Sequence, residues 1–394
     1  ILAAQALWQL LLPYVNLLKL VAVPLIFISI LSAINKLENS AGIGRMSLTI
    51  VACMLCLVMV AGWVGLFTAD LLGLDASAFS HMQSTLTAED VSKTAAVSLP
   101  QLVTSLIPTN IFLDLTGARS VSVIGIVIFT LLAGVALLKV KKEAPEEGQK
   151  LSSGINAIQI WVMKMVRIVI ALTPYGVLAL MAKVFSTYQL AQFTSLLGFI
   201  AACYLAVAIM FIVHAILLLV SGHHPLRYFK TVWPVLTFAF VSRSSAASIP
   251  LAITAQEKFG VPNTIANIAA SFGSSMGQNG CAGIYPAIMV AMIAPTLGID
   301  PLSFSFLASL LPAIALGSIG VAGVGGGGTF AALIVLSTLN FPVALVGIFI
   351  AIEPIVDMAR TALNVNGSMM SGVLASRLLK HQSAKSHHAA SISE

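Results

Sequence analysis

The sequence predicts an all-α polytopic membrane protein, and three observations support this fold class. Hydrophobic residues make up 58% of the 394 residues and charged residues only 9%, whereas a typical soluble domain is about 25% charged. Apolar runs at 17–34, 48–67 and 204–220 reach or approach the roughly 20 residues with which a helix crosses a bilayer. Basic and non-basic connections alternate along the chain, as the positive-inside rule describes for a protein with several spans.

The spans and the charges between them predict a topology. We expect spanning helices over about 6–35, 47–74, 120–139, 156–183 and 193–221. Basic residues gather in four connections or tails: Lys36 with Arg45, Lys139 with Lys141, Lys142 and Lys150, Arg227 with Lys230, and Arg377 with Lys380 and Lys385. The intervening connections, near 75–100, 184–192 and 295–300, contain one basic residue, Lys93. The C-terminus is therefore expected in the cytoplasm.

The remaining connections are assigned by their polarity. The segments 141–150 and 222–230 are expected to be solvated cytoplasmic loops, and the polar stretch 75–119 an external excursion with short helices. Because Ile1 stands within hydrophobic sequence, we expect a further N-terminal segment, a whole helix, before it. The net charge of +6 is dispersed among the loops, so it does not indicate nucleic-acid binding.

Two apolar regions after residue 230 are interrupted by residues that weaken helices. The segment FVSRSSAASIP (240–250) brings serines and an arginine into the first, and GSIGVAGVGGGGTF (317–330) brings seven glycines into the second. Glycine frees the backbone and destabilises helices. Irregular backbone at membrane depth is tolerated only where it is buried in protein or lines a cavity.

The loop at 222–230 is expected inside, the connection at 295–300 outside and the C-terminal tail inside. The chain between 230 and 300, and again between 300 and 394, therefore accommodates one hairpin and one full span. Both breaks are therefore interpreted as the tips of re-entrant hairpins, one entering from each side of the membrane. Two interrupted segments in corresponding halves indicate the binding site of an inverted-repeat transporter. The alternative is that the glycine run is a flexible loop or a tight helix-packing surface.

A stripe of polar residues follows in the last apolar segment, AIEPIVDMARTALNVNG (351–367). Its members are spaced by three or four and share one helical face: Glu353, Asp357, Arg360, Asn364 and Ser368. Charges at membrane depth are costly and normally face a bundle interior or cavity. The stripe is interpreted as a zwitterion site, with a carboxylate for an ammonium group and a guanidinium for a carboxylate. The alternative is a structural Asp357–Arg360 pair that neutralises itself.

A third polar island, SFGSSMGQNGCAGIY (271–285), lies between the two predicted hairpins. Glycines on both sides of Gln278 and Asn279 predict an unwound helix, whose carbonyl and amide groups are available to a ligand or cation.

In this order the elements resemble the dicarboxylate/amino acid:cation symporter family, whose best-known members transport glutamate and aspartate. The likeness extends over essentially the whole chain. More narrowly, the segments WPVLTFAFVSRSSAASIPL, ASFGSSMGQNGCAGIYPA, GVAGVGGGGTFAALIVL and ALNVNGSM resemble the bacterial L-cystine symporters of this family. The resemblance implies a glutamate-transporter-like fold in an inverted repeat. It also implies a homotrimeric scaffold that carries mobile transport domains, which move like an elevator.

The resemblance also implies which residues bind substrate. The candidates are Ser244, Ser245, Asn279, Cys281, Gly323, Val324, Gly325, Asp357, Arg360, Thr361 and Asn364. Ser244 and Ser245 would hold the α-carboxylate, and Asp357 would receive the α-ammonium. Gly323 to Gly325 would form the second hairpin tip, the extracellular gate. Arg360 matches the arginine that reads an acidic side chain, and in this chain it would pair with the distal carboxylate of cystine.

The chain departs from its sodium-coupled relatives at two positions. Where they carry NMDGT it has GQNGC (277–281), and where they carry an aspartate after the conserved asparagine it has Ser368. Loss of anionic ligands weakens sites for hard cations. Proton coupling is therefore expected, with Glu353 or Asp357 as carrier, although carbonyl groups around Gly273, Ser275 and the second hairpin leave one sodium site open as an alternative.

These observations predict a secondary active importer of L-cystine in a bacterial inner membrane. The expected organisation is a scaffold with some mobile helices in 1–230, a core transport domain in 231–380 and a cytoplasmic tail in 381–394. No cofactor or metal is expected beyond the coupling ion, H⁺ or Na⁺. The expected partners are the substrate, the lipid bilayer and two further copies of the chain.

Four other functions are weighed. The first is sodium-driven uptake of acidic amino acids or dicarboxylates, although a dicarboxylate has no ammonium for Asp357. An intramembrane hydrolase needs a serine matched to His214, and the sequence offers none. A passive channel leaves the two hairpins unexplained, and a primary pump needs a nucleotide-binding motif that this sequence lacks.

Overall fold

The computed structural model describes residues 41–76, 109–116, 122–172, 190–319, 327–342, 346–350 and 352–392, with residue 175 and scattered positions between 17 and 35. In this part of the chain the regular structure is entirely helical, which confirms the predicted class. The helices up to the unwound segment are α2 (Ala41–Leu71), α6 (Ile111–Leu115), α7 (Ser122–Glu143), α8 (Pro145–Ala171), α10 (Leu190–Val220), α11 (Pro225–Ser242), α12 (Ile249–Phe259) and α13 (Asn263–Gly273). A π-helix (Asn279–Ile284), α14 (Tyr285–Ile293), a 3₁₀ turn (Ala294–Leu297), α15 (Phe304–Ile319), α16 (Gly327–Thr338), α17 (Val346–Phe349) and α18 (Glu353–Ile392) follow.

Three of the described helices are long and apolar enough to cross a membrane: Gly44–Leu71, Thr194–Val220 and Asn279–Leu297. The first two agree with the spans expected at 47–74 and 193–221. The third is made of three consecutive segments of different helix type: a π-helix, α14 and a 3₁₀ turn. The helix α6 lies in the stretch where short helices are expected.

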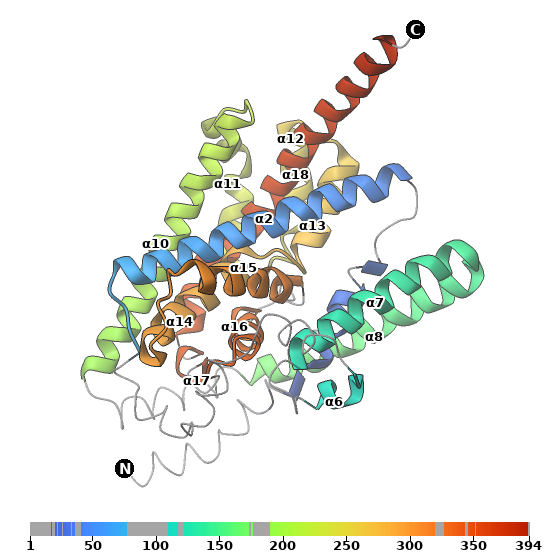
Figure 1. Ribbon diagram of the computed structural model, residues 1–394. Helices are drawn as coiled ribbons and strands as arrows, with labels where there is room; N and C mark the ends of the chain where they lie inside the picture. The colour runs from blue at the N-terminus through green and yellow to red at the C-terminus, as the bar shows by residue number, and fades with distance from the viewer. Residues whose placement is uncertain are drawn as a thin grey trace.

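The predicted loop at 141–150 is wrong in its conformation. Helix α7 continues to Glu143 and α8 begins at Pro145, so a single residue separates them. Proline fits the first turn of a helix, where its missing N–H costs nothing. Acidic residues in that turn, Glu146 and Glu147, favour the positive end of the helix dipole. The residues are solvent-exposed, as expected, but they form a helical hairpin (Figure 1).

The predicted loop at 222–230 is also shorter than expected. Helix α11 begins at Pro225, again with proline in its first turn. The connection from α10 is a tight turn in which Gly222 has a positive φ of 76°.

Buried polar side chains hold the first described helical residues against the α7–α8 hairpin. Asn35 accepts a bond from Ser152 Oγ at 2.8 Å and donates to the Ser152 carbonyl at 3.2 Å. Lys141 Nζ donates to the Asn35 carbonyl at 2.5 Å. One turn earlier, Ser32 Oγ donates to Gln159 Oε1 at 2.5 Å. Asn35 is therefore the centre of a polar joint between three helices.

Replacing Asn35 by alanine is expected to destabilise this joint. Ser152 loses its partners at a half-buried site, and an unmade buried hydrogen bond costs about 1–3 kcal/mol. The thermal unfolding midpoint of purified protein in detergent should fall by several degrees. Lys150→Ala is the control, because it removes only an exposed ion pair with Glu147, and such pairs contribute little. Equal midpoints for the two variants would contradict the assignment.

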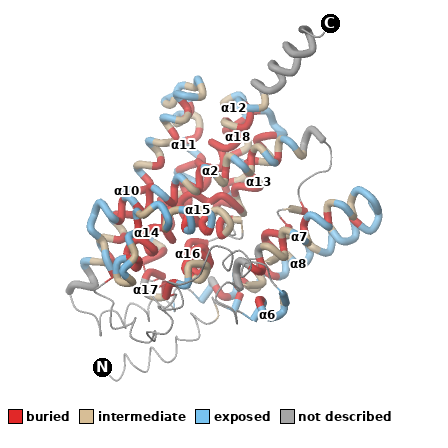
Figure 2. The backbone as a smooth tube through the Cα atoms, viewed as in Figure 1, coloured by how far each residue is buried: buried red, intermediate tan, exposed pale blue. Residues whose placement is uncertain are grey.

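The core lies where α2, α10, α14, α16 and α18 meet. Figure 2 shows buried residues concentrated along these helices, whereas α8 is largely exposed. Helix α18 packs against α2, α10, α11 and α13. It is buried almost continuously from Ile352 to Ser376. This burial explains why its polar stripe must find partners inside the protein.

The first break forms the tip of a helical hairpin. Helix α11 ends at Ser242, Arg243 adopts a left-handed conformation with φ 52°, and α12 begins at Ile249. Helices α11 and α12 pack against each other, and the tip between them reaches α18, where Arg243 bonds Asp357. The second pair, α15 and α16, also pack together. Re-entry of either hairpin into a membrane stays a prediction.

Candidate functional site

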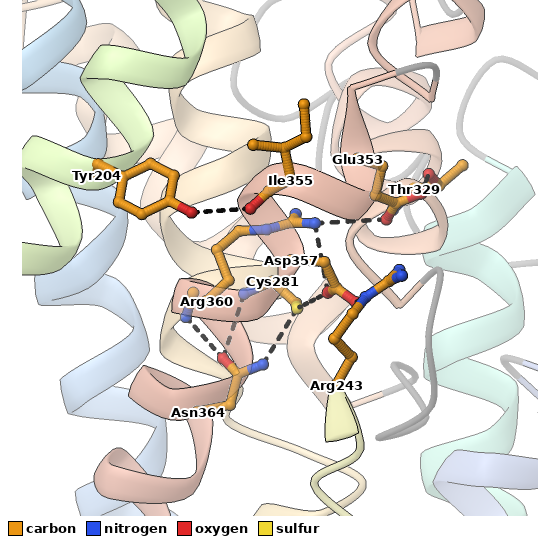
Figure 3. Close-up of polar contacts among 10 residues, drawn as sticks. Tyr204, Arg243, Cys281, Thr329, Glu353, Ile355, Asp357, Arg360 and Asn364 are labelled. Atoms are coloured by element: carbon orange, nitrogen blue, oxygen red, sulfur yellow. Dashed lines mark hydrogen bonds and ion pairs between the residues drawn. The ribbon is translucent and has the colours of Figure 1, made fainter. Parts of the chain in front are cut away.

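The polar stripe of α18 lies inside the protein. Its five members have at most 5% of their surface exposed, and they occupy successive turns of one helical face, as the spacing predicts. Between Asp357 and Asn364 the separating residues include good helix formers, Met358, Ala359, Ala362 and Leu363. Figure 3 shows the first four members converging with Arg243 at the first hairpin tip, Cys281 in the π-helix and Thr329 on α16.

Arg360 occupies the centre of the site and has no exposed surface. Its Nη2 lies 3.5 Å from Oε1 of Glu353 and 3.4 Å from Oδ1 of Asp357. Its guanidinium carbon stands 4.0 Å from the ring centroid of Tyr285 on α14, a favourable cation–π geometry. Nε and Nη1 are buried and have no hydrogen-bond partner among the described residues. Because a buried unpaired donor is costly, these two nitrogens are suited to an anionic ligand.

Asp357 has a different partner on each carboxylate oxygen. Arg243 at the tip of the first hairpin donates from Nε to Oδ2 at 2.9 Å. The other oxygen, Oδ1, faces Arg360 and lies 3.7 Å from the thiol of Cys281. The Arg243 side chain keeps 33% of its surface exposed, whereas that of Asp357 keeps 2%. The pair therefore joins a buried carboxylate to a cation that reaches solvent.

Glu353 is held by the start of α16. The hydroxyl of Thr329 donates to Oε2 at 2.5 Å, and its backbone N–H donates to Oε1 at 3.1 Å. Backbone N–H groups in the first turn of a helix have no intrahelical acceptor, and the helix dipole favours an acid there. Glu353 thus ties the second hairpin to α18.

The island at 271–285 is unwound, as predicted. Helix α13 ends at Gly273, and the chain resumes as a π-helix at Asn279. Asn364 on α18 closes this break, because its Oδ1 accepts from the N–H groups of Gly280 and Cys281 at 2.7 and 3.2 Å. Its Nδ2 donates to the Cys281 sulfur at 3.0 Å. Both polar atoms of the Asn364 side chain therefore have partners within the protein.

The two serines at the first hairpin tip, Ser244 and Ser245, do not bond the charged side chains of the cluster in the structure. Ser244 is half-buried, and its hydroxyl accepts from the Ala247 N–H at 3.2 Å within the tip. Ser245 is buried and lines a small cavity of about 10 Å³ with Gly273, Ser274 and Ser368. The Ser368 hydroxyl donates to the Ala269 carbonyl at 2.9 Å. The cavity thus joins a candidate for substrate binding to two candidates for ion coupling.

The remaining sequence-predicted residues that the structure describes make no contact with the charged side chains that defines a role for them. Thr361 is buried next to Arg360. Ser275 donates to the Phe272 carbonyl at 3.2 Å within its own turn, and Ser274 lines the cavity in its place. Gly323, Val324 and Gly325 lie outside the described residues.

Sequence reasoning did not assign roles to Arg243, Thr329 or Tyr285. Arg243 stands directly before the two serines and Thr329 directly after the glycine run, so their positions beside predicted tips were the available signal. No sequence signal pointed to Tyr285, because a tyrosine at the start of an apolar helix does not by itself indicate a cation–π contact.

The four charged side chains of the cluster, Glu353, Asp357, Arg360 and Arg243, sum to zero formal charge. Such a cluster suits a zwitterion, which brings one group of each sign and leaves the balance unchanged. A buried charge that lacks its partner is strongly destabilising, so a ligand with only one sign of charge would upset this balance.

Comparison with known proteins places this geometry in a family. The sequence matches the sodium:dicarboxylate symporter family over residues 5–378. The chain belongs to this family. It is 46% identical over 372 residues to an L-cystine uptake protein, TcyP, of Bacillus cereus. The aligned region covers 93% of this chain and 80% of the relative. TcyP of Shouchella clausii is 45% identical over 370 residues, again 93% of this chain and 80% of the relative. An uncharacterized symporter of Haemophilus influenzae is 46% identical over 372 residues, 93% of this chain and 84% of the relative.

The family assignment fixes the class of function. The protein is a membrane transporter and not an enzyme. The buried acids and arginines of the cluster are therefore candidates for the binding or coupling groups of a symporter.

Proposed function

We propose that this symporter takes up L-cystine, with protons as the coupling ion. The observation that carries the proposal is the pairing on α18 of a buried carboxylate, Asp357, with a guanidinium, Arg360, two of whose nitrogens have no partner in the described part of the chain. Cystine carries two amino-acid heads, each with an ammonium and a carboxylate. In the proposed complex, one ammonium bonds Asp357 and the distal carboxylate bonds Arg360.

The relatives support this choice of substrate. Two of them are named for L-cystine uptake and are 46% and 45% identical to the chain over 93% of its length. Plain dicarboxylates fit the cluster less well, because they bring no ammonium to Asp357. They would also add two negative charges to a balanced site.

The choice of proton coupling follows from the distribution of acids. Residues 263–294, which include the unwound segment, contain no Asp or Glu, and Ser368 offers a hydroxyl at the end of the stripe. Hard cations favour anionic oxygen ligands. The acids of the site are Glu353 and Asp357, and we propose that one of them carries the proton.

We propose an elevator mechanism within a homotrimer, in which residues 231–380 form the core of the moving unit. Helices α2 and α10 pack directly against α18, which supports their moving with that core. Helices α7 and α8 pack against each other, and α7 also packs against α6 and, less extensively, α16, which supports their belonging to the scaffold. The protein would lie in a bacterial inner membrane, with the basic C-terminal tail in the cytoplasm.

Uptake of radiolabelled L-cystine into proteoliposomes tests the proposal, with proton and sodium gradients imposed separately. A proton gradient alone should drive accumulation, and Glu353→Gln should tell which acid carries the proton. If Glu353 is the carrier, that variant keeps cystine exchange but loses accumulation. Uptake that requires sodium would overturn the coupling proposal, and uptake of aspartate without cystine would overturn the substrate.

Arg243→Gln is expected to strengthen cystine binding. In the ligand-free protein the Arg243 guanidinium occupies Oδ2 of Asp357, the group proposed for the substrate ammonium, so it competes with substrate. A hydrogen bond to a charged group contributes about 1.5–3 kcal/mol, so KM for cystine uptake should fall by about tenfold or more. Arg227→Gln, in the exposed first turns of α11, is the control. A higher KM in Arg243→Gln would mean that Arg243 binds the substrate itself.

A further inference from the structure

Four buried polar side chains form a chain of contacts beside the cluster, and no role has been assigned to it. They are Tyr228 on α11, Asn366 on α18, His214 on α10 and Asn279 in the π-helix, each with no exposed surface. Tyr228 Oη donates to Asn366 Oδ1 at 3.1 Å. The Asn366 amide lies 2.7 Å from His214 Nδ1, and the Asn279 amide 3.2 Å from His214 Nε2.

The direction of each bond follows from hydrogen-bonding capacity. Tyr228 donates to the oxygen of Asn366, so the Asn366 nitrogen faces His214 Nδ1. That amide can only donate, so Nδ1 is the acceptor. A neutral imidazole has one acceptor and one donor nitrogen, so Nε2 carries the hydrogen. The structure places Asn279 Nδ2 against Nε2 and leaves Asn279 Oδ1 without a partner among the described residues. The Asn279 amide must then be turned, so that its oxygen accepts from His214.

A charged imidazolium does not fit this chain. It would donate from both nitrogens, so Asn366 would have to turn its oxygen to His214, and Tyr228 would lose its acceptor. Among the described residues His214 has no acidic partner. Its polar neighbours are Asn366 on α18 and Asn279 in the π-helix. Phe211 on α10 packs against its ring. The charged groups of α18, from Glu353 to Arg360, lie at least six residues before Asn366. A buried charge without a partner is costly.

The bond from His214 fixes the unwound segment. Asn279 is followed by Gly280 and Cys281, whose N–H groups bind Asn364 beside the charged cluster. The Asn279 side chain also lies against Gly367, where an added Cβ would come within 2.6 Å of the amide group. His214 and the glycine together hold the Asn279 side chain in one place.

We propose that His214 is a positioning residue for substrate binding. Held neutral, with its hydrogen on Nε2, it donates to Asn279 and keeps the segment 279–281 in register with Asn364 and Arg360. This inference rests on the proposed function, because the site that it positions is the proposed cystine site. The coupling proton then resides elsewhere, on Glu353 or Asp357.

Two substitutions test the role in proteoliposome uptake of radiolabelled cystine. Glutamine offers one donor and one acceptor, so His214→Gln should keep KM within about threefold of wild type and leave the pH profile of proton-driven uptake unchanged. His214→Leu removes the His214 partner of both asparagines, although Asn366 keeps its bond from Tyr228, and should raise KM about tenfold or more. His224→Gln, at the exposed start of α11, is the control. A wild-type KM in His214→Leu, or loss of proton-driven accumulation in His214→Gln, would overturn the proposal.

Nitrogen-15 NMR of histidine-labelled protein in detergent tests the tautomer without any transport. The signals that disappear in His214→Gln should show a protonated Nε2 and an unprotonated Nδ1, and Tyr228→Phe should perturb them. A protonated Nδ1, or an imidazolium near neutral pH, would overturn the inference even if cystine uptake is normal. Failure of wild-type cystine uptake would instead overturn the proposed substrate and leave the tautomer result standing.

Discussion

Asp357→Asn is expected to abolish cystine uptake while the protein still inserts and folds. Asparagine keeps the shape of the side chain but removes its charge, so a substrate ammonium loses its ion pair. Arg243 and Arg360, which both contact this carboxylate, would leave excess positive charge at the site. Removing one member of a buried hydrogen-bonded charge pair costs about 2–5 kcal/mol of binding, so affinity should fall at least about 30-fold.

Cystine binding to purified protein, measured by calorimetry, checks this directly. Uptake under an imposed proton gradient gives the second reading. Asp300→Asn is a matched control, because Asp300 is an acid in the turn before α15, where it accepts from the Leu302 N–H at 2.9 Å. Binding of wild-type strength in Asp357→Asn would remove the carboxylate from the substrate site. The Asp357–Arg360 contact would then be the self-neutralising structural pair that the sequence left open.

The alternation of spacing by three and four in the last helix was sufficient to predict one shared face, because helix geometry is local. The unwound segment was predictable for the same reason, since glycines around Gln278 act on their own backbone. What the sequence did not reveal were partners distant along the chain. Arg243 and Asp357 are 114 residues apart, and His214 and Asn366 are 152 apart. No local pattern encodes those contacts.

The errors at 141–150 and 222–230 have a common physical cause. Charged residues with proline and glycine indicate a loop when they are taken together. Proline in the first turn of a helix instead preserves every hydrogen bond, and both α8 and α11 begin with it. Polarity correctly predicted exposure at α8, but exposure does not decide between helix and loop.

Gly280→Ala is expected to eliminate transport by separating the π-helix from α18. A Cβ at this position would lie 2.6 Å from the Arg360 carbonyl oxygen and 2.7 Å from its Cα. Real side chains do not approach backbone atoms so closely, and backbone cannot rotate away as a side-chain tip can. The two elements must therefore move apart, which breaks the bonds from Gly280 and Cys281 to Asn364. Overpacking of this kind typically costs about 1–3 kcal/mol of stability.

The variant should accordingly unfold at a lower temperature and bind cystine too weakly to measure, since Arg360 is displaced together with the helix that carries it. Gly154→Ala is the matched control: its Cβ meets nothing within 4 Å, and alanine favours the α8 helix over glycine. Both changes add one methyl group to a helical glycine, so any difference between them reports the contact with Arg360. Normal uptake in Gly280→Ala would show that binding does not need the close approach of these two elements. The arrangement of the whole cluster would then also be dispensable for binding.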